Sequence, residues 1–255
     1  MFVKNNSMSL LSNIYVITIK RNLDRQTRMT NLLGKHNLQF SFIDGIDGEH
    51  LIPEHLNKVF DSHKSKQRLG YALTKNEIAC SLSHIKALKS FLEDDKQDYA
   101  LILEDDVEIS NLDVWLKAVV CLPHKNKWDV LYLGYQNKNH IMPLPVLIKW
   151  RFIYPVLNFL KIKRYNLKKI RLTFDRLYNK HWIQLGAHNG AYAYLVNKNA
   201  AKKIIEYNTP LFVQADVVLM DLIIKGKINA FGLSKTIFEP NFEIQSSIGN
   251  RATWK

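Results

Sequence analysis

Cysteine is scarce in this chain: Cys80 and Cys121 are the only two among 255 residues. That number excludes the small disulfide-stapled domains of secreted proteins and is typical of a reducing compartment. No apolar run approaches the roughly 18 residues that a membrane-spanning helix needs, and the N-terminus lacks the pattern of a signal peptide. Neither a G-x-x-x-x-G-K-[ST] loop nor a G-x-G-x-x-G turn occurs, which removes two common routes to phosphate binding. We therefore expect a cytoplasmic protein.

Acidic residues are also few, 23 against 36 Lys and Arg, and the net charge is +13. Most of the excess falls between Lys149 and Lys180, where Asp175 is the one acid. Aromatic side chains run through the same stretch: Trp150, Phe152, Tyr154, Phe159, Tyr165, Phe174 and Tyr178. Three interpretations stay open: an anionic membrane surface, a solvated basic helix whose aromatic residues pack on the main domain, and nucleic acid. We expect the membrane, with Trp150, Phe152 and Phe159 entering the headgroup region, and no nucleic-acid partner.

Hydrophobic patterning predicts strands that alternate with helices. Short apolar runs predict strands at residues 14–19, 40–43, 129–133 and 191–196, and one that ends at residues 104–106. Helices are expected at about 24–35, 75–92, 112–121, 198–207 and 216–225. Such alternation is typical of an α/β sheet with crossover connections. We expect one domain over residues 1–255, with a basic, aromatic-rich insertion at about 141–182.

Glu104, Asp105 and Asp106 directly follow a short apolar strand, at the point where it should emerge from the sheet. Adjacent carboxylates repel one another, and burying them unpaired is costly, so a cation beside them is the simplest explanation. Oxygen ligands suit Mg²⁺ or Mn²⁺, which often keep positions open for substrate phosphates. The triplet therefore predicts a metal–diphosphate site at a strand end. For the tripeptide alone, an acidic turn in solvent is the alternative.

The expected helix at 75–92 carries polar groups beside its apolar stripe. It is introduced by Thr74-x-x-Glu77, the capping-box pattern. In projection, Glu77, Ser81 and His84 fall along one partly buried edge, where polar groups need partners. The capping box already accounts for Glu77, and His84 could equally be a core histidine with a satisfied ring.

Several segments, taken in order, resemble glycosyltransferase family 25, the lipopolysaccharide and lipooligosaccharide biosynthesis enzymes with a collagen-modifying branch. These segments are the strand and arginine-bearing turn at 16–25, Phe42-Ile-Asp44-Gly-Ile-Asp47-Gly48, Leu73-Thr74-x-x-Glu77-Ile-Ala-Cys80-Ser-Leu-Ser83-His84, Leu103-Glu104-Asp105-Asp106-Val107, Gly190-Ala-Tyr192-x-Tyr194, Ala215-Asp216 and Gln245-Ser246-Ser247-Ile248. Ala79 stands where the family usually has glycine. The resemblance covers about 14–135 and 186–249 and leaves the insertion unassigned.

The resemblance implies a GT-A-like fold, with one central mixed sheet flanked by helices and the nucleotide at the carboxyl ends of its parallel strands. It implies an inverting transfer, most simply of galactose from UDP-galactose to a lipid-linked lipooligosaccharide core, at the inner face of the inner membrane. Asp106 would be the first ligand of Mn²⁺ or Mg²⁺, with Glu104 as the second ligand and Asp105 as an alternative ligand or ribose contact. The implied donor-binding residues are Thr18, Arg21, Arg25, Asp44, Glu77, Ser83, His84, Asp105 and Asn189, with the two arginines as bidentate phosphate or nucleobase contacts.

An inverting transfer also needs a base that deprotonates the acceptor hydroxyl opposite the leaving group. Asp216 and Asp221 are candidates, but five helical positions turn a side chain by about 140°, so the two cannot point the same way. Asp216 stands at the expected helix start, where it can face a cleft, and we expect it to be the base. A plain N-cap is its simpler role, and Glu239 is an alternative base.

Two functions of other kinds remain open. A nucleotidyl- or phosphotransferase would use the same metal–diphosphate site. A non-enzymatic membrane- or nucleic-acid-binding protein would explain the charge of residues 149–180 but would leave the acidic triplet without a role. Mn²⁺-dependent hydrolysis of a UDP-sugar would separate the enzyme from the binding protein.

Overall fold

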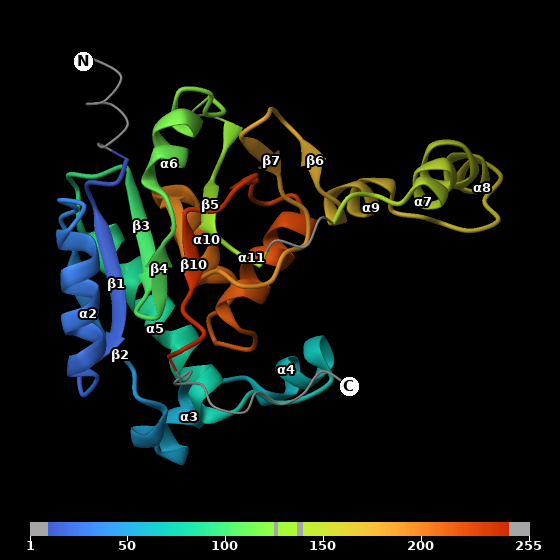
Figure 1. The fold of residues 1–255 in the computed structure, drawn as a ribbon. Helices are drawn as coiled ribbons and strands as arrows, with labels where there is room; N and C mark the ends of the chain where they lie inside the picture. The colour runs from blue at the N-terminus through green and yellow to red at the C-terminus, as the bar shows by residue number, and fades with distance from the viewer. Residues whose placement is uncertain (1–9, 125–126, 137–139, 245–255) are drawn as a thin grey trace.

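A mixed sheet of eight strands forms the centre of the molecule (Figure 1), for which a computed structural model describes residues 10–124, 127–136 and 140–244. From edge to edge its strands are β2 (Ser41–Gly45), β1 (Ile14–Ile19), β3 (Tyr99–Glu104), β8 (Ala193–Asn197), β5 (Val130–Gly134), β9 (Ala230–Leu233), β7 (Trp182–Gln184) and β6 (Arg176–Leu177). β1 is parallel to β2 and β3, whereas β8 is antiparallel to both β3 and β5. The expected single central mixed sheet is therefore confirmed.

The carboxyl ends of β1, β2, β3, β5 and β9 gather at one edge of this sheet, because these strands point the same way. The antiparallel β8 begins at the same edge, since Ala193 pairs with Leu103. The amide of Glu104, the last residue of β3, donates to the carbonyl of Tyr192 at 3.0 Å. Open α/β sheets bind ligands outside the carboxyl ends of their strands, so this edge is where a site is expected.

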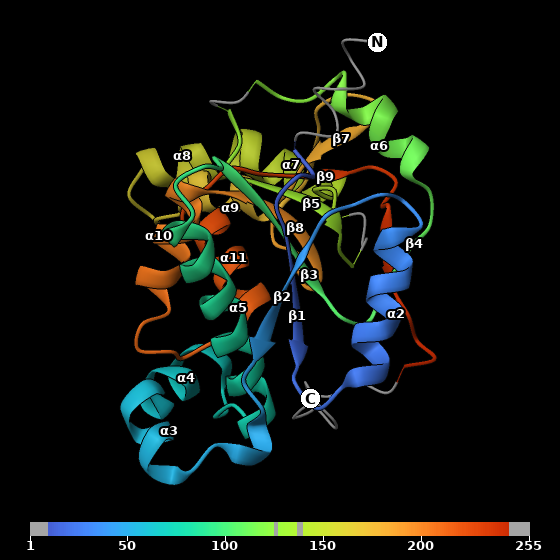
Figure 2. The same ribbon diagram turned by 90° about the vertical axis from the view of Figure 1, so that its left-hand side faces the viewer.

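Helices cover both faces of the sheet (Figure 2). One face is covered by α5 (Lys75–Glu93), α10 (Lys198–Tyr207) and α11 (Ala215–Ile224), the other by α2 (Leu23–Gly34) and α6 (Leu112–Val119). Successive residues of β3 alternate between the two layers: Ile102 is buried with Phe91 of α5, and Leu101 with Met29 of α2. This two-sided burial explains why the central strands show continuous apolar runs rather than alternation.

Most predicted elements agree with the structure to within two residues, and the strand at 14–19 and the helix at 198–207 match it fully. The capping box is present: Thr74 Oγ1 accepts from the Glu77 amide at 3.3 Å, and Glu77 Oε2 accepts from the Thr74 amide at 2.8 Å. The strand expected at 40–43 begins at Ser41 and continues two residues further than predicted, to Gly45. The segment Gln245–Ile248 lies outside the described residues.

Several short elements carry no pattern from which they could be predicted. They are η1 (Gly48–His50), α3 (Pro53–Val59), α4 (Ser62–Leu69), and the two strands of a small antiparallel sheet, β4 (Val107–Ile109) and β10 (Phe238–Pro240). α3 buries none of its residues and α4 buries only Ser65, so neither needs an apolar stripe. β4 and β10 are three residues long, too short for periodicity to register.

Most of the predicted insertion at 141–182, residues 144–173, forms an arm that projects away from the sheet (Figure 1). The end of the insertion does not belong to the arm, because β6 and the first residue of β7 are part of the central sheet. The helical parts of the arm are α7 (Leu144–Ile148), the π-helical turn η3 (Lys149–Ile153), α8 (Tyr154–Phe159) and α9 (Leu167–Thr173). At its root the buried Asp175 lies 2.7 Å from His188 Nε2 and accepts from the Gly186 amide at 2.8 Å. Burial acts to raise the pKa of Asp175, but the hydrogen bonds from His188 and Gly186 outweigh it and lower that pKa.

The arm exposes large apolar side chains beside its cations. Phe159 is 85% exposed and Phe152 is 65% exposed. Trp150, in contrast, is half-buried, and its indole N–H donates to the Leu167 carbonyl at 3.0 Å, so it joins two parts of the arm instead of facing outward as predicted. Within the described part of the chain, no helix combines the length and the apolar character that a membrane crossing requires.

Candidate active site

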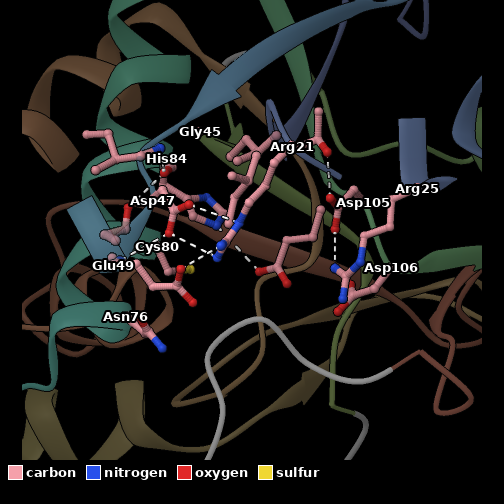
Figure 3. Close-up of a pocket in the computed structure, with 18 residues that line it drawn as sticks. Arg21, Arg25, Gly45, Asp47, Glu49, Asn76, Cys80, His84, Asp105 and Asp106 are labelled. Atoms are coloured by element: carbon pink, nitrogen blue, oxygen red, sulfur yellow. Dashed lines mark hydrogen bonds and ion pairs between the residues drawn. The ribbon is translucent and has the colours of Figure 1, made fainter. Parts of the chain in front are cut away.

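A pocket opens at the carboxyl ends of β1, β2 and β3, against the first turns of α5 (Figure 3). Its polar and charged lining residues are Thr18, Arg21, Arg25, Asp47, Glu49, Asn76, Cys80, Ser83, His84, Glu104, Asp105 and Asp106. The sheet thus brings together side chains that are far apart in the sequence, such as Thr18 and Asp105, which are 87 positions apart. Of the predicted site residues, Asp44, Glu77, Asn189 and Asp216 do not line this pocket.

Asp105, the middle residue of the acidic triplet, is held by two partners. Its Oδ2 accepts from the Thr18 hydroxyl at 2.6 Å, and its Oδ1 accepts from Arg25 Nη1 at 2.6 Å. Arg28, one turn further along α2, donates to the carbonyls of Asp105 and Val107. The Arg25 charge and the Thr18 hydroxyl therefore fix the acidic turn, and each oxygen of Asp105 already has a partner within the protein.

Glu104 and Asp106, on either side, carry the negative charge that remains. The pKa of Asp106 is raised to about 6 by burial first and then by the charges of Glu104 and Asp105, and the nearby Arg25 offsets only part of this. A divalent cation would offset the repulsion among the carboxylates and would favour the ionised form of the buried Asp106. Carboxylate oxygens at a pocket wall also have the chemistry that Mg²⁺ and Mn²⁺ prefer. The residues present therefore fit the expected metal.

Arg21 lies at the rim, 3.0 Å from Asp47 Oδ2 through its Nε and 2.5 Å from Glu49 Oε2 through Nη1. Half of the Arg21 side chain is exposed. Asp47 also caps η1 by accepting from the Glu49 amide. Glycine is required after Asp47 for a steric reason: a Cβ at Gly48 would lie 2.1 Å from the Asn76 side-chain oxygen on α5.

The wall formed by α5 contains two predicted residues, Ser83 and His84, and two polar residues that were missed, Asn76 and Cys80. Ser83 accepts from the Ile46 amide at 2.8 Å and so holds the loop after β2 against the helix. His84 is buried, with Nε2 3.4 Å from Glu104 Oε1. Cys80 lies one helical turn before His84 in the same wall. The four-residue spacing of Cys80 and His84 on an expected helix was a signal that could have identified it.

Three predicted donor contacts lie elsewhere. Glu77 is buried, with one oxygen in the capping box and the other accepting from Gln214 Nε2 at 3.0 Å, so it joins α5 to the start of α11. Asp44 and Asn189 are exposed. The structure does not bring these three residues into the pocket.

Asp216 is the second residue of α11, whose N-cap is Gln214, so the N-cap role considered for it is wrong. Its Oδ2 accepts from the Gly190 amide at 3.0 Å, which places it beside the segment that leads into β8, at the sheet edge where the acidic triplet also lies. Asp221, within the helix, is buried and paired with Arg68 and the Tyr207 hydroxyl. The alternative base Glu239 is exposed on β10.

Comparison with solved structures gives weak likenesses. A197 from STIV aligns with a TM-score of 0.39 and 14% identity, over 89% of this chain and 82% of its own. Mouse xyloside xylosyltransferase 1 aligns with a TM-score of 0.36 and 10% identity, over 88% and 77%. At these TM-scores neither likeness carries weight for fold or function.

Comparison with curated proteins gives relatives over about half of the chain. Procollagen galactosyltransferase 2 of Homo sapiens is 27% identical over 128 residues, 48% of this chain and 20% of its own length. Inactive glycosyltransferase 25 family member 3 of Mus musculus is 28% identical over 134 residues, 49% and 22% respectively. The chain thus spans about a fifth of the length of these relatives.

A family model covers far more of the chain. The model described as "Glycosyltransferase family 25 (LPS biosynthesis protein)" matches residues 11–219, a range that includes the whole pocket and runs into α11. The match confirms the resemblance found in the sequence, and the chain belongs to glycosyltransferase family 25.

Proposed function

We propose that this chain is an inverting, metal-dependent glycosyltransferase that moves a sugar, most simply galactose from UDP-galactose, onto a lipid-linked lipooligosaccharide or lipopolysaccharide core. The observation that carries the proposal is the pair Glu104 and Asp106 in the wall of one pocket, where burial first and then the neighbouring carboxylates raise the pKa of Asp106 to about 6. A relative named inactive matches this chain as well as one named a galactosyltransferase does, so activity has to be argued from these residues.

Asp106 and Glu104 would hold the cation, Mn²⁺ or Mg²⁺. When bound, such an ion neutralises the donor diphosphate and stabilises the charge that grows on the leaving group. Arg21 is the cation of the protein best placed to contact that diphosphate, because its guanidinium is half-exposed at the rim and would exchange Asp47 and Glu49 for phosphate. Arg25 and Thr18 contribute indirectly in this scheme, by holding Asp105 and with it the turn.

Asp216 would deprotonate the acceptor hydroxyl. Its carboxylate is half-buried and accepts hydrogen bonds from the amides of Gly190 and Val217, which fix it at the edge of the sheet. Glu239 is the alternative base. It is exposed on β10, and it lies near Tyr192, whose pKa is raised by burial first and then by the charges of Glu239 and Glu104. The acceptor would then lie between the pocket and the start of α11.

The arm would hold the enzyme on the anionic inner face of the inner membrane, where a lipid-linked acceptor is confined. Phe152, Phe159 and Ile162 are exposed on it next to Lys161, Lys163 and Arg164, the mixture that suits a charged lipid surface. In this proposal residues 1–255 form one catalytic domain, and the arm adds location without contributing to the chemistry. We also propose that nucleic acid is not a partner of this chain.

A donor screen tests the proposal directly. The purified chain is incubated with Mn²⁺ and a panel of UDP-sugars, and released UDP is measured with and without chelator. We expect cation-dependent release with one sugar preferred. Release of pyrophosphate instead of UDP would indicate a nucleotidyltransferase, and no turnover together with salt-sensitive binding to DNA or RNA would indicate a binding protein.

A further inference from the structure

Cys80, His84 and Glu104 form a compact cluster on the α5 side of the pocket (Figure 3 labels the first two). The Cys80 sulfur, a ring nitrogen of His84 and a carboxylate oxygen of Glu104 all lie within 4.8 Å of one another. Cys80 and His84 project from the same face of α5, because four positions make about one helical turn. Glu104 comes to them from the end of β3. The cluster is therefore built by two elements that the core already fixes.

The surroundings of His84 orient its ring toward this cluster. Its Nδ1 lies 3.1 Å from the hydroxyl of the buried Tyr194, and the two rings stack with an interplanar angle of 14°. With the Nδ1 proton donated to that hydroxyl, Nε2 presents a lone pair to Glu104 Oε1 at 3.4 Å. In this tautomer both facing atoms are acceptors, and a cation between them would satisfy both. A second hydrogen bond on the far ring nitrogen is also the usual arrangement around a metal-binding histidine.

We propose that Cys80, His84 and Glu104 bind a zinc-class divalent cation, as a site distinct from the oxygen-only pair formed by Glu104 and Asp106. A thiolate and an imidazole favour zinc over Mg²⁺ or Mn²⁺, for which carboxylate and phosphate oxygens are preferred. Three protein ligands leave a fourth tetrahedral position for water or a ligand atom, and all three residues line the pocket. Because Glu104 belongs to both sets, zinc bound here withdraws it from Asp106.

Cobalt is the probe, since Co²⁺ replaces zinc and its bond to a thiolate is visible by absorption. The reduced, metal-stripped full chain is titrated with Co²⁺, and Zn²⁺ is then added. We expect one equivalent of Co²⁺ with a thiolate-to-cobalt charge-transfer band, and displacement by one equivalent of Zn²⁺. Absence of the band in the wild-type protein overturns the proposal.

Matched variants assign the ligands. Cys80→Ser should remove the band and weaken Co²⁺ binding by more than about 100-fold, beyond the effect of losing an outer-shell partner. Cys121→Ser, at the exposed cysteine outside the pocket, should change neither. Tyr194→Phe deletes only the hydroxyl that orients His84, and we expect about 10–100-fold weaker binding with the band retained. A band that survives Cys80→Ser or disappears in Cys121→Ser, or equal affinity in Tyr194→Phe and wild type, contradicts the assignment.

Asp106→Asn separates this site from the proposed activity. Its carboxylate is not a ligand in the cluster, so the variant should keep the cobalt band even if Mn²⁺-dependent turnover is lost. Loss of the band in Asp106→Asn would mean that there is one cation site instead of two, which overturns the inference. A wild-type protein that releases UDP with Mn²⁺ but shows no cobalt band overturns this inference alone.

Discussion

The pocket at the sheet edge and the arm at 144–173 differ in how their charged residues are paired. In the pocket, charged groups from distant parts of the chain meet: Arg25 of α2 pairs with Asp105 after β3, 80 positions away, at 2.6 Å. In the outer part of the arm, α7 to α8, the contacts are local, whereas α9 packs against α11. Asn158 and Tyr165 exchange two hydrogen bonds seven positions apart, and the cations around them are exposed.

The comparison shows which part of the molecule depends on the fold. The pocket exists only when three strands and two helices are assembled, and its carboxylates keep charge that a ligand can compensate. The arm holds itself together through Trp150 and the stacked rings of Tyr154 and Tyr165, and its exposed cations and phenylalanines face solvent. We therefore expect changes in the pocket to alter chemistry and changes in the arm to alter location.

The largest effect should come from Asp106→Asn. The amide keeps the shape of the side chain but removes the charge that holds the cation, and several kcal/mol of leaving-group stabilisation correspond to a loss of about 10³-fold or more in turnover. UDP release is measured with Mn²⁺ at saturating donor. Asp95→Asn, at a side chain that is 99% exposed, is the control and should retain full activity. Near-normal turnover in Asp106→Asn would remove Asp106 from the metal site.

Asp216→Asn should lower kcat by about 10²–10⁴-fold, the usual contribution of a general base, with little change in the KM for the donor. Asp221→Asn is its counterpart on the same helix. Because Asp221 is buried against Arg68 and the Tyr207 hydroxyl, its replacement should reduce the free energy of unfolding instead. If donor KM rose in Asp216→Asn while kcat held, Asp216 would be a donor contact and Glu239 the better candidate base.

Removing charge from the arm should weaken membrane binding and, through it, slow transfer to a lipid-linked acceptor. The variant replaces Lys161, Lys163, Arg164, Lys168 and Lys169 with Gln. Each cation near an anionic leaflet contributes roughly 1 kcal/mol, so even two that face the lipid make binding to anionic vesicles at least about tenfold weaker. Transfer to a soluble oligosaccharide should change little, and transfer to a lipid-linked acceptor should slow.

A control with the same change in net charge replaces five exposed lysines outside the arm: Lys35, Lys58, Lys89, Lys202 and Lys235. Vesicle binding should survive in this control. Equal losses in both variants would mean that net charge, not the arm, attracts the lipid. Binding that does not respond to salt would contradict an electrostatic anchor altogether.

The smallest effect concerns stability and pH. A pKa raised to about 6 means that ionised Asp106 destabilises the metal-free fold above that pH, and this cost disappears as pH falls through 6 toward 3.8. In chelator, the free energy of unfolding of Asp106→Asn should therefore exceed that of wild type at pH 8, by at most about 3 kcal/mol. The difference should be smaller at pH 5. Denaturant unfolding at both pH values measures it. A gain that is the same at both would contradict the origin given for the shift.

The sequence predicted where the pocket lies in the sheet, but it did not predict how the side chains in the pocket pair. Strands at 14–19 and 99–104 are buried on both faces, so their apolar runs identify them, and the acidic triplet marks the edge where they end. Side-chain pairing across that edge was not predictable. Whether Arg25 contacts phosphate or Asp105 depends on how α2 packs beside β3, a long-range contact with no local signature. Glu77 illustrates the reverse, since its capping box was visible in the sequence and is confirmed.

The arm was predicted as a charged excursion but not as a folded one. Composition identified its cations and aromatic residues, whereas the role of Trp150 depends on a hydrogen bond to Leu167, 17 positions later. The same limit applies to Asp175, which is the one acid of the basic stretch and whose function, pairing with His188 at the root of the arm, required the tertiary structure.

The central claim is that Glu104 and Asp106 hold a cation that binds the donor diphosphate. Calorimetric titration of UDP into the purified chain, with and without Mn²⁺, tests it most directly, because linkage requires metal and nucleotide to strengthen each other's binding through a shared site. We predict that Mn²⁺ tightens UDP binding in wild type and has no such effect in Asp106→Asn. UDP affinity that is the same with Mn²⁺ as in chelator, or a Mn²⁺ effect that persists in Asp106→Asn, would contradict the account.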